Sequence, residues 1–533
     1  MIGDRHDRAR RGRAVLGVIG VMALAVATGC GGRDDDLDAF IESGDAVGLN
    51  RAVAIGDAAR NRVVLLSSES PSELAVTPLP VGENRLAMLP SVDGDGLLVL
   101  SSGERPRRNA DDELPSLTLI DASAEPRIQA RYPLPDAFST LTLDPTGRWV
   151  VLSGAGDNFV SNPNQLVLVD LLDPDFDPIT KTIRSFGAAP ERFQFTEPLD
   201  VPGGERRFLI VESRQDITLV DLDDPERPEI TVGLPLTPSG APGRPLQVVV
   251  HPGEPDVPED AQIAIRLEND PNLVLVNFTP AEDAALAFNL TLNLVDVGGP
   301  PAAVDFVTTD GGLRLAAVVP ARTEANLVHP LTTGVEHVSL PARFDQFRRV
   351  TEGALADEPG DVALLWSQNT SMVGFWSLGR TENQAFRSVD TVNLETNVNQ
   401  LFDVPGTQLG HRKLLQSPDN RFFVLDLRTR QSFPMFASGR NLSLRVAPDG
   451  LRAWAFAAGS PLLAKVDLET LEPTSLEIER GISQLFDIET QSGAGRVLIA
   501  LHPGGGRGAT VLDAIAPDTA DSRFFPGLLL RAQ

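Results

Sequence analysis

Few side chains in this sequence have the types and spacing that metal binding or catalysis requires. Asp173, Asp175 and Asp177 in the stretch DPDFDP place carboxylates two residues apart, as a calcium-binding loop does. The glycine and the closing glutamate of an EF-hand loop are missing, so we expect a solvated loop here. The glycine-rich stretch 504–508 could surround an anion with backbone N–H groups, but no Gly-Lys-Ser/Thr follows it, which excludes a P-loop.

The other residues that commonly carry chemistry are isolated. No HExxH motif, HxH pair, GxSxG nucleophile elbow or SxxK motif occurs. His251 and His502 each precede Pro-Gly, so we expect both of them in turns. The sequence therefore predicts no catalytic residue, no metal site and no cofactor, and favours a protein without enzymatic activity, while leaving an enzyme open. The six histidines are His6, His251, His329, His337, His411 and His502.

The single cysteine, Cys30, follows the most specific pattern in the chain. Five arginines between Arg5 and Arg13 form a basic region, and Ala14–Thr28 is an apolar stretch without charge. That stretch is shorter than the roughly 20 residues that span a bilayer, so it indicates a signal peptide rather than a transmembrane helix. One cysteine allows neither an internal disulfide nor a multi-cysteine metal site.

The end of this stretch, Ala27-Thr28-Gly29-Cys30, resembles the bacterial lipobox. The resemblance implies that residues 1–29 are a lipoprotein signal peptide, that cleavage occurs between Gly29 and Cys30, and that Cys30 is acylated. Several acyl chains on one residue would anchor the protein stably, whereas one chain binds only marginally. The implied location is the bacterial cell envelope, and Gly31 after the cysteine favours the outer over the inner membrane.

Residues 30–50 combine the expected acylated Cys30 with a run of acidic side chains and few apolar ones. This composition predicts a flexible acidic tether. The whole chain has a net charge of −27, which argues against nucleic acid as a partner because phosphate binding needs clustered Lys and Arg. The membrane contact is therefore expected through the lipid anchor alone.

The rest of the chain is organised around a recurring strand that ends in a polar residue, as in LTLIDA, LVLVDL and ITLVDL. Neighbouring copies lie roughly 41–56 residues apart, except across one gap that holds two weaker copies. A strand-rich repeat of this period is typical of a β-propeller, in which each repeat is one four-stranded blade. We expect these polar residues in turns, where they accept backbone N–H groups. They are Asp121, Asp170, Asp221, Asn277, Asp426, Asp467 and Asp513.

We therefore predict an all-β protein, with residues 51–533 forming a single large ring of about 8–10 blade-like units. The first unit lacks an evident first strand, so a strand from the C-terminus within Phe524–Leu530 could complete it. The hairpins DPTGRWVVLSG (Asp144–Gly154) and APDGLRAWAFA (Ala447–Ala457), with later strands closing in V-D-L, resemble those of YVTN and WD-repeat-like bacterial propellers. The literal YVTN and WD signatures are absent.

These expectations favour a membrane-anchored envelope lipoprotein whose propeller is a non-catalytic scaffold for an envelope protein of unknown identity. Rigid rings with variable loops suit this role because binding residues collect on loops. Two alternatives remain open: a lactonase-like hydrolase, as some YVTN-like propellers are, and a propeller that binds a small ligand in its central channel. A cluster of Arg, His and carboxylates at one channel mouth would favour the hydrolase.

Overall fold

The structure is a computed structural model, and it describes the chain from residue 46 onward with short gaps. The described residues are 46–105, 108–154, 160–173, 175–185, 189–253, 261–281, 288–350, 362–379, 389–406, 408–435, 442–503, 508–517 and 521–528. They belong to one compact unit, Ala39–Gln533, and everything below concerns that unit. Within these ranges no helix is long and apolar enough to cross a bilayer.

Ten four-stranded antiparallel sheets account for almost all strands of the described residues, and we number them blade 1 to blade 10 in chain order. Blade 1 consists of β1 (Ala46–Gly48), β2 (Val53–Asp57), β3 (Arg62–Ser67) and β4 (Ala75–Pro80). Blade 2 consists of β5 (Arg85–Pro90), β6 (Gly96–Ser101), β7 (Ser116–Asp121) and β8 (Arg127–Pro133). Blade 3 consists of β9 (Thr140–Leu143), β10 (Trp149–Ser153), β11 (Gln165–Asp170) and β12 (Ile179–Thr182). Blade 4 consists of β13 (Arg192–Phe195), β16 (Phe208–Glu212), β17 (Asp216–Asp221) and β18 (Ile230–Gly233). Blade 5 consists of β19 (Pro245–His251), β20 (Gln262–Leu267), β21 (Asn272–Pro280) and β22 (Phe288–Asp296). Blade 6 consists of β23 (Ala303–Thr309), β24 (Gly312–Val319), β25 (Glu324–Val328) and β26 (Val335–Ser339). Blades 7 to 10 consist of β27 (Gln346–Val350), β28 (Val362–Trp366), β29 (Thr370–Ser377), β30 (Val389–Val398); β31 (Gln400–Asp403), β32 (Arg412–Gln416), β33 (Phe422–Asp426), β34 (Gln431–Pro434); β35 (Leu442–Val446), β36 (Arg452–Ala457), β37 (Leu462–Asp467), β38 (Pro473–Glu477); β39 (Gln484–Glu489), β40 (Arg496–Leu501), β41 (Gly508–Asp513), β42 (Arg523–Pro526). A small hairpin, β14 (Leu199–Val201) and β15 (Gly204–Arg206), and one 3₁₀ turn, Ala58–Arg60, complete the set.

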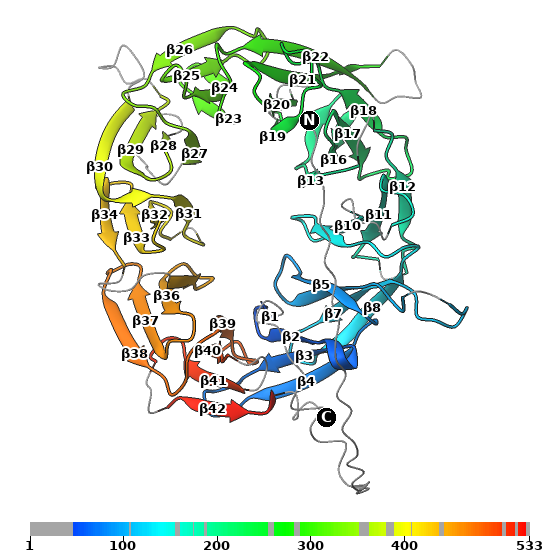
Figure 1. Ribbon diagram of the computed structural model, residues 1–533, viewed down its shortest axis with the longest axis vertical. Helices are drawn as coiled ribbons and strands as arrows, with labels where there is room; N and C mark the ends of the chain where they lie inside the picture. Colours follow the sequence, from blue (N-terminus) through cyan, green and yellow to red (C-terminus); the bar gives the residue numbers. More distant parts are fainter. Residues whose placement is uncertain are drawn as a thin grey trace, which may run out of the picture. The chain divides into compact units, whose positions relative to one another are not determined.

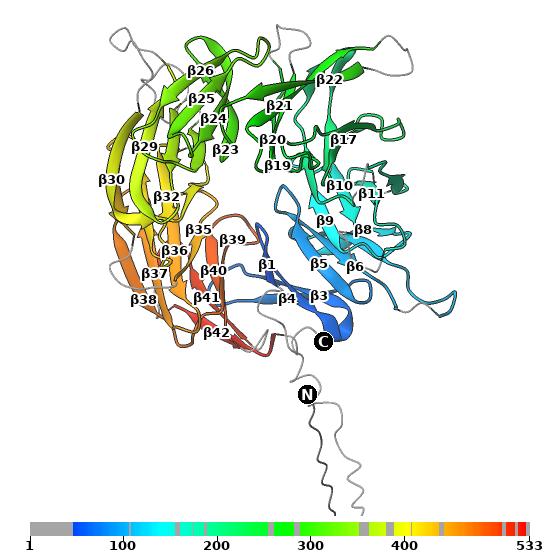
Figure 2. The same ribbon diagram turned by 45° about the horizontal axis from the view of Figure 1, so that its top comes forward.

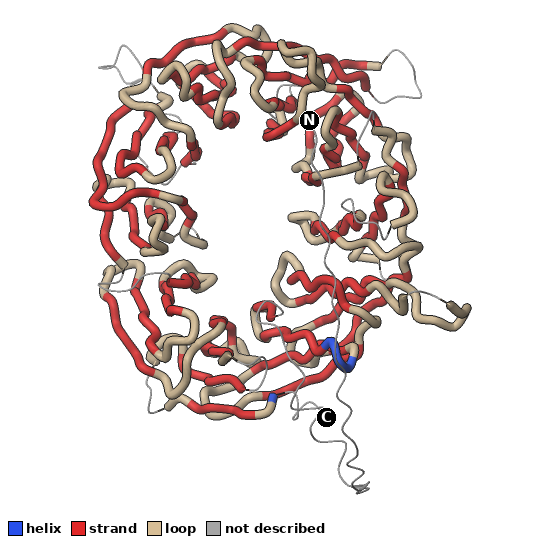
Figure 3. The backbone as a smooth tube through the Cα atoms, viewed as in Figure 1, coloured by secondary structure: helices blue, strands red, loops and turns tan. Residues whose placement is uncertain are grey.

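The blades are arranged in a ring around a central channel (Figure 1), so the predicted propeller of about 8–10 blades is confirmed with ten. The first strands labelled in Figure 1, such as β19, β23 and β27, lie on the inner side of the ring and the fourth strands, such as β22, β26 and β30, lie outside, and the tube view shows the strands around the whole circle (Figure 3). Within each blade the strands follow one another as an antiparallel meander, so every blade is one uninterrupted stretch of chain.

Hydrophobic packing between neighbouring blades closes the ring. The middle strands are buried on both faces, as VAIGD in β2 and FLIVE in β16 show, because each sheet lies between two others. Such strands read as short continuous apolar runs. Ten hydrophobic clusters occur, one between each pair of consecutive blades, including one that joins blade 10 to blade 1. Four tryptophans are buried in these clusters: Trp149, Trp366, Trp376 and Trp454.

Blade 1 is complete without help from the C-terminus, which corrects the expectation of an exchanged strand. Its inner strand is β1, whose residues pair with β2 as Ala46↔Ile55, Val47↔Ala54 and Gly48↔Val53. The C-terminal strand β42 instead pairs with β41 as the outer strand of blade 10. The first strand escaped sequence reasoning because its three residues, Ala-Val-Gly, follow an acidic stretch and form no apolar run.

This strand also shifts the start of the propeller. Residues 46–50 of the expected tether belong to the ring, and residues 30–45 lie outside the described part of the chain. Gly48 is needed in β1 because a Cβ there would lie 2.9 Å from Cδ1 of Phe486 in blade 10. The inner strand is thus fitted against both of its neighbours, and Figure 2 shows it between β5 and β39.

Hydrogen bonds supplement the packing where blade 10 meets blade 1. The Glu489 N–H donates to the Asn50 carbonyl at 2.6 Å, and the Ser492 N–H donates to Oε2 of Glu69 at 3.0 Å. Arg523 of β42 donates to the Ser72 carbonyl at 2.9 Å. The seam is therefore held by side chains and loop contacts rather than by a shared sheet.

Candidate functional site

Six of the seven repeated polar residues lie where strand three of a blade ends in a turn. In each of them Oδ1 accepts backbone N–H groups two or three residues ahead, at distances between 2.7 and 3.2 Å. These residues are Asp121, Asp170, Asp221, Asp426, Asp467 and Asp513. The seventh, Asn277, lies inside the long strand β21, which continues to Pro280, so its side chain forms no such turn.

Several of these aspartates also pair with an arginine of the adjacent strand or turn. Asp170 contacts Arg148 at 2.9 Å, and Asp221 contacts both Arg206 and Arg227 at 2.8 Å. Because the arrangement recurs around the ring, it fixes hairpins and does not mark one site.

The remaining residues singled out in the sequence do not converge. His502 is buried, with Nδ1 2.8 Å from the Gly481 carbonyl and Nε2 2.8 Å from Thr510 Oγ1, and burial lowers its pKa. Oδ1 of Asp173 accepts the Asp175 N–H, as in a solvated turn. No group of three or more His, Cys, Asp or Glu in the described ranges could hold a metal. Gly29, Cys30 and residues 504–507 lie outside those ranges.

The candidate site is a groove on the inner wall of the ring, formed by two adjoining hollows that share Arg445 and Val446 of β35. The first hollow, about 520 Å³, lies between blades 8, 9 and 10, and is lined by residues of β31, β35 and β39 among others. The second, about 480 Å³, lies between blades 9, 10, 1 and 2 and includes the whole of β1. We call the two together the Arg445 groove.

Strand β35 builds the groove through its alternation. Leu442, Leu444 and Val446 pack against the hydrophobic cluster between blades 8 and 9. Ser443 and Arg445 alternate with them and are exposed, as side chains on the other face of a strand must be. The Arg445 guanidinium lies over the Phe486 ring of blade 10, with its carbon 5.5 Å from the ring centroid.

A repeated motif that sequence reasoning missed supplies much of the lining. QLFD occurs at Gln400–Asp403 in β31 and again at Gln484–Asp487 in β39, two blades apart. Phe402 is 39% exposed at the first hollow, and Phe486 forms the platform under Arg445. An internal search for short repeated words, rather than for catalytic motifs, could have found this pair.

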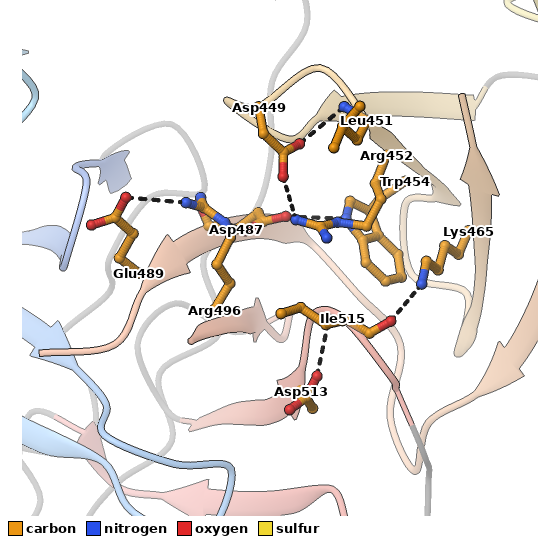
Figure 4. A network of polar contacts seen from close by, with 10 residues as sticks. All are labelled: Asp449, Leu451, Arg452, Trp454, Lys465, Asp487, Glu489, Arg496, Asp513 and Ile515. Atoms are coloured by element: carbon orange, nitrogen blue, oxygen red, sulfur yellow. Dashed lines mark hydrogen bonds and ion pairs between the residues drawn. The ribbon is translucent and has the colours of Figure 1, made fainter. Parts of the chain in front are cut away.

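Both aspartates of the motif are already paired with cations. Asp403 contacts Nζ of Lys413 at 2.6 Å and the Arg348 guanidinium at 2.9 Å. Asp487 accepts a hydrogen bond from Nε of Arg496 at 2.7 Å and from Nε1 of Trp454 at 3.3 Å (Figure 4). Both carboxylates of the groove lining are thus already engaged in ion pairs.

The polar network beneath the groove joins blades 9 and 10. Lys465 of β37 donates to the Ile515 carbonyl at 2.6 Å, next to Asp513, whose Oδ1 accepts the Ile515 N–H (Figure 4). Burial and then the neighbouring Arg452 lower the pKa of Lys465. Arg496 also contacts Glu489, so its charge is shared by two carboxylates. Of these residues Asp487 lines the groove, and its bonds to Arg496 and Trp454 restrain β39 there.

The groove offers an apolar surface, uncharged hydrogen-bonding side chains such as Ser443 and Gln484, and one guanidinium that forms no ion pair with a carboxylate of the described residues. No cluster of Arg, His and carboxylates of the kind that would favour a hydrolase lies in its lining.

No family model and no curated protein matches this chain. Among solved structures, the chain is similar to dihydro-heme d1 dehydrogenase NirN in complex with DHE at 12% identity, covering 68% of this chain and 71% of that one, with a TM-score of 0.40. It is similar to BBS1N in complex with ARL6DN at 12% identity, covering 66% and 94%, with a TM-score of 0.35. It is also similar to the β-propeller domain of Cps50 (Swd1) from Myceliophteria thermophila at 13% identity, covering 64% and 100%, with a TM-score of 0.33. At such identities and TM-scores none of them bears on the function of this chain.

Proposed function

We propose that this chain is a lipid-anchored protein of the bacterial cell envelope whose propeller binds another protein and catalyses no reaction. The observation that carries the proposal is the state of the charged side chains. The carboxylates lining the Arg445 groove are tied to cations, and the recurring aspartates brace hairpins. The inner wall presents apolar surface and hydrogen-bonding groups on a rigid ring, and these are the features of a binding surface.

The anchor and the location rest on the N-terminal pattern. A basic stretch, a short apolar stretch and a lipobox-like ending at Cys30 support acylation and export. The described chain begins at the inner strand β1, so an anchored tether would enter the ring at its channel wall. A partner bound to the propeller would then be held close to the membrane.

Replacing Cys30 by serine is expected to move most of the protein from the membrane to the soluble fraction, because the serine hydroxyl cannot take the thioether-linked lipid. The measurement is the membrane-bound share after a carbonate wash, together with incorporation of a labelled fatty acid. Thr28→Ser is the control, since it keeps a small residue before the cysteine and should leave the protein bound. A Cys30→Ser protein that stays in washed membranes would contradict the anchor.

Crosslinking the intact protein in its native membranes tests the scaffold role. A single envelope protein recovered in stoichiometric amount, and identified by mass spectrometry, supports it. A propeller recovered alone would instead favour the second candidate, a small ligand bound in the central channel. The Arg445 groove is the specific observation in favour of that second candidate.

A further inference from the structure

Arg445 differs from Asp403 and Asp487, the other charged residues of the groove, because no described residue of opposite charge is paired with it. Among the described residues its guanidinium has one contact of note, the Phe486 ring, and no carboxylate lies within ion-pair distance. By comparison, Asp403 has two cations and Asp487 has one. The chain has a net charge of −27, so an unpaired cation on the inner wall makes the electrostatic potential there locally more positive than over the rest of the protein.

Among the described residues, the N–H groups of the Arg445 guanidinium make no hydrogen bond and no ion pair. One face of the guanidinium is covered by Phe486, which restrains the side chain by a cation–π contact. The edge of a guanidinium carries N–H groups in a fixed fork that fits a carboxylate through two parallel hydrogen bonds. Arg445 also stands where the two hollows meet, so a group bound to it would reach both.

The surroundings select the kind of anion. Apolar side chains line the first hollow around the guanidinium, and the uncharged Ser443 and Gln484 lie beside it. Asp403 and Asp487 are already paired with cations, so among the described lining residues only Arg445 is left to balance a bound anion, and one guanidinium balances a singly charged group but not a doubly charged one such as phosphate. The apolar residues that a bound group would meet are Phe402, Leu442, Leu444, Val446 and Phe456.

We propose that the Arg445 groove binds a carboxylate carried on an apolar group, with the carboxylate on the Arg445 guanidinium and the apolar part in the first hollow. Two sources share this chemistry: a free organic acid, and the C-terminal carboxylate of a peptide or protein partner. The inference goes beyond the proposed function, because it holds for either source and does not depend on the membrane anchor.

The test is isothermal titration calorimetry of the full-length protein in detergent micelles, with matched probes. 3-Phenylpropanoate and 3-phenylpropanamide differ only in the charged group, as do a tetrapeptide ending in phenylalanine and its C-terminal amide. We expect each acid to bind about tenfold to a hundredfold more tightly than its amide, as a hydrogen-bonded charged pair does. Tighter binding of the peptide acid than of the free acid identifies the peptide source, and the reverse order identifies the small molecule.

Substitutions at two arginines separate the groove from general charge effects. Arg445→Gln should abolish the preference for acid over amide, and Arg445→Lys should restore part of it, because lysine keeps the charge without the fork. Arg480→Gln is the matched control, since Arg480 also lies over a phenylalanine, at 4.1 Å from the Phe524 ring, but lines neither hollow. It should leave the preference unchanged.

Three results would overturn the proposal: equal binding of acids and amides, no binding of either, or the same loss of preference in Arg480→Gln as in Arg445→Gln. Circular dichroism melts of the variants confirm that each is folded before its binding is compared. If the crosslinked envelope partner is still recovered while the acids fail to bind, the carboxylate site is wrong and the scaffold function stands.

Discussion

Replacing Asp144 by alanine is expected to lower the free energy of unfolding by about 3–5 kcal/mol, the usual cost of removing one partner of a buried ion pair. The Asp144 side chain is fully buried, and Arg207 of the next blade is only 16% exposed. The two Arg207 terminal nitrogens contact the two carboxylate oxygens at 2.6 and 3.0 Å. Without Asp144 the guanidinium would be left between blades 3 and 4 with no charged partner.

Blade 9 shows that the cost would come from the lost side-chain contacts of Asp144, to Arg207 and to Thr146, and not from the backbone of the turn. Ala447 occupies there the place of Asp144, and both turns have the same backbone hydrogen bonds, with Gly147 N–H to the Asp144 carbonyl and Gly450 N–H to the Ala447 carbonyl at 2.8 Å. Alanine is therefore compatible with the turn itself. Additionally replacing Arg207 by methionine should recover part of the loss, because it removes the unpaired charge.

Urea unfolding followed by circular dichroism is the measurement. Asp419→Ala is the control, because Asp419 and Arg421 form an exposed pair whose loss should change stability little. If Asp144→Ala were no more destabilising than Asp419→Ala, the pair would not be a clamp between blades.

The ion pair between Asp144 and Arg207 also predicts how the free energy of unfolding changes with pH. Burial by itself would raise the pKa of Asp144, but hydrogen bonds from Arg207 and Thr146 outweigh it and hold the pKa below its ordinary value of 3.8. The unfolded chain then binds the proton more readily than the folded one in acid. The stabilisation is present above the ordinary pKa and is lost as the pH falls through the folded pKa. Asp144→Ala should accordingly lose less stability on acidification than the parent.

Deleting residues 521–533 is expected to cost on the order of 5 kcal/mol or more, since it removes two buried side chains that each contribute several kcal/mol. Phe525 is 5% exposed and Leu528 fully buried, and both belong to the cluster that joins blade 10 to blade 1. The deletion also removes β42 and exposes the edge of β41 to water. The melting temperature should fall sharply.

Because the truncated chain could fail to fold, Leu528→Ala in the full-length chain is the companion variant. It should lower stability by about 2–5 kcal/mol. Ile515→Ala, which shortens an exposed side chain in the same blade, is its control and should change stability little. An unchanged melt of the deletion would mean that the outer strand contributes nothing to the closure of the ring.

The fold could be predicted largely from the sequence because the same strand pattern recurs in most of the blades. The hairpin expected at Asp144–Gly154 is present, with its turn beginning at Asp144 and its strand β10 following at Trp149–Ser153. Each interface between blades forms between consecutive copies of this repeat. The predicted inner strand from the C-terminus was wrong because β1, which takes that place, carries no apolar run of its own and is held by pairing with β2 and by contacts with blades 2 and 10.

The groove could not be predicted in the same way. Its residues come from five blades, so they lie far apart in the chain, and Arg445 and Phe486 meet only because consecutive blades stack. The partner of Asp144 is likewise 63 residues away. Periodicity predicts which residues face a neighbouring blade, but it contains no information about which side chain of that blade lies opposite.

The closure of the ring without an exchanged strand has a consequence for how such a protein can change in evolution. Each blade is one uninterrupted stretch, and every blade meets its neighbours through the same kind of apolar face. A duplication or loss of one segment of about 50 residues therefore adds or removes a whole blade without breaking any other. In a ring whose last strand completes the first blade, the two ends must be inherited together. Here no blade depends on a distant segment for its sheet, so rings with different numbers of blades are expected among its relatives.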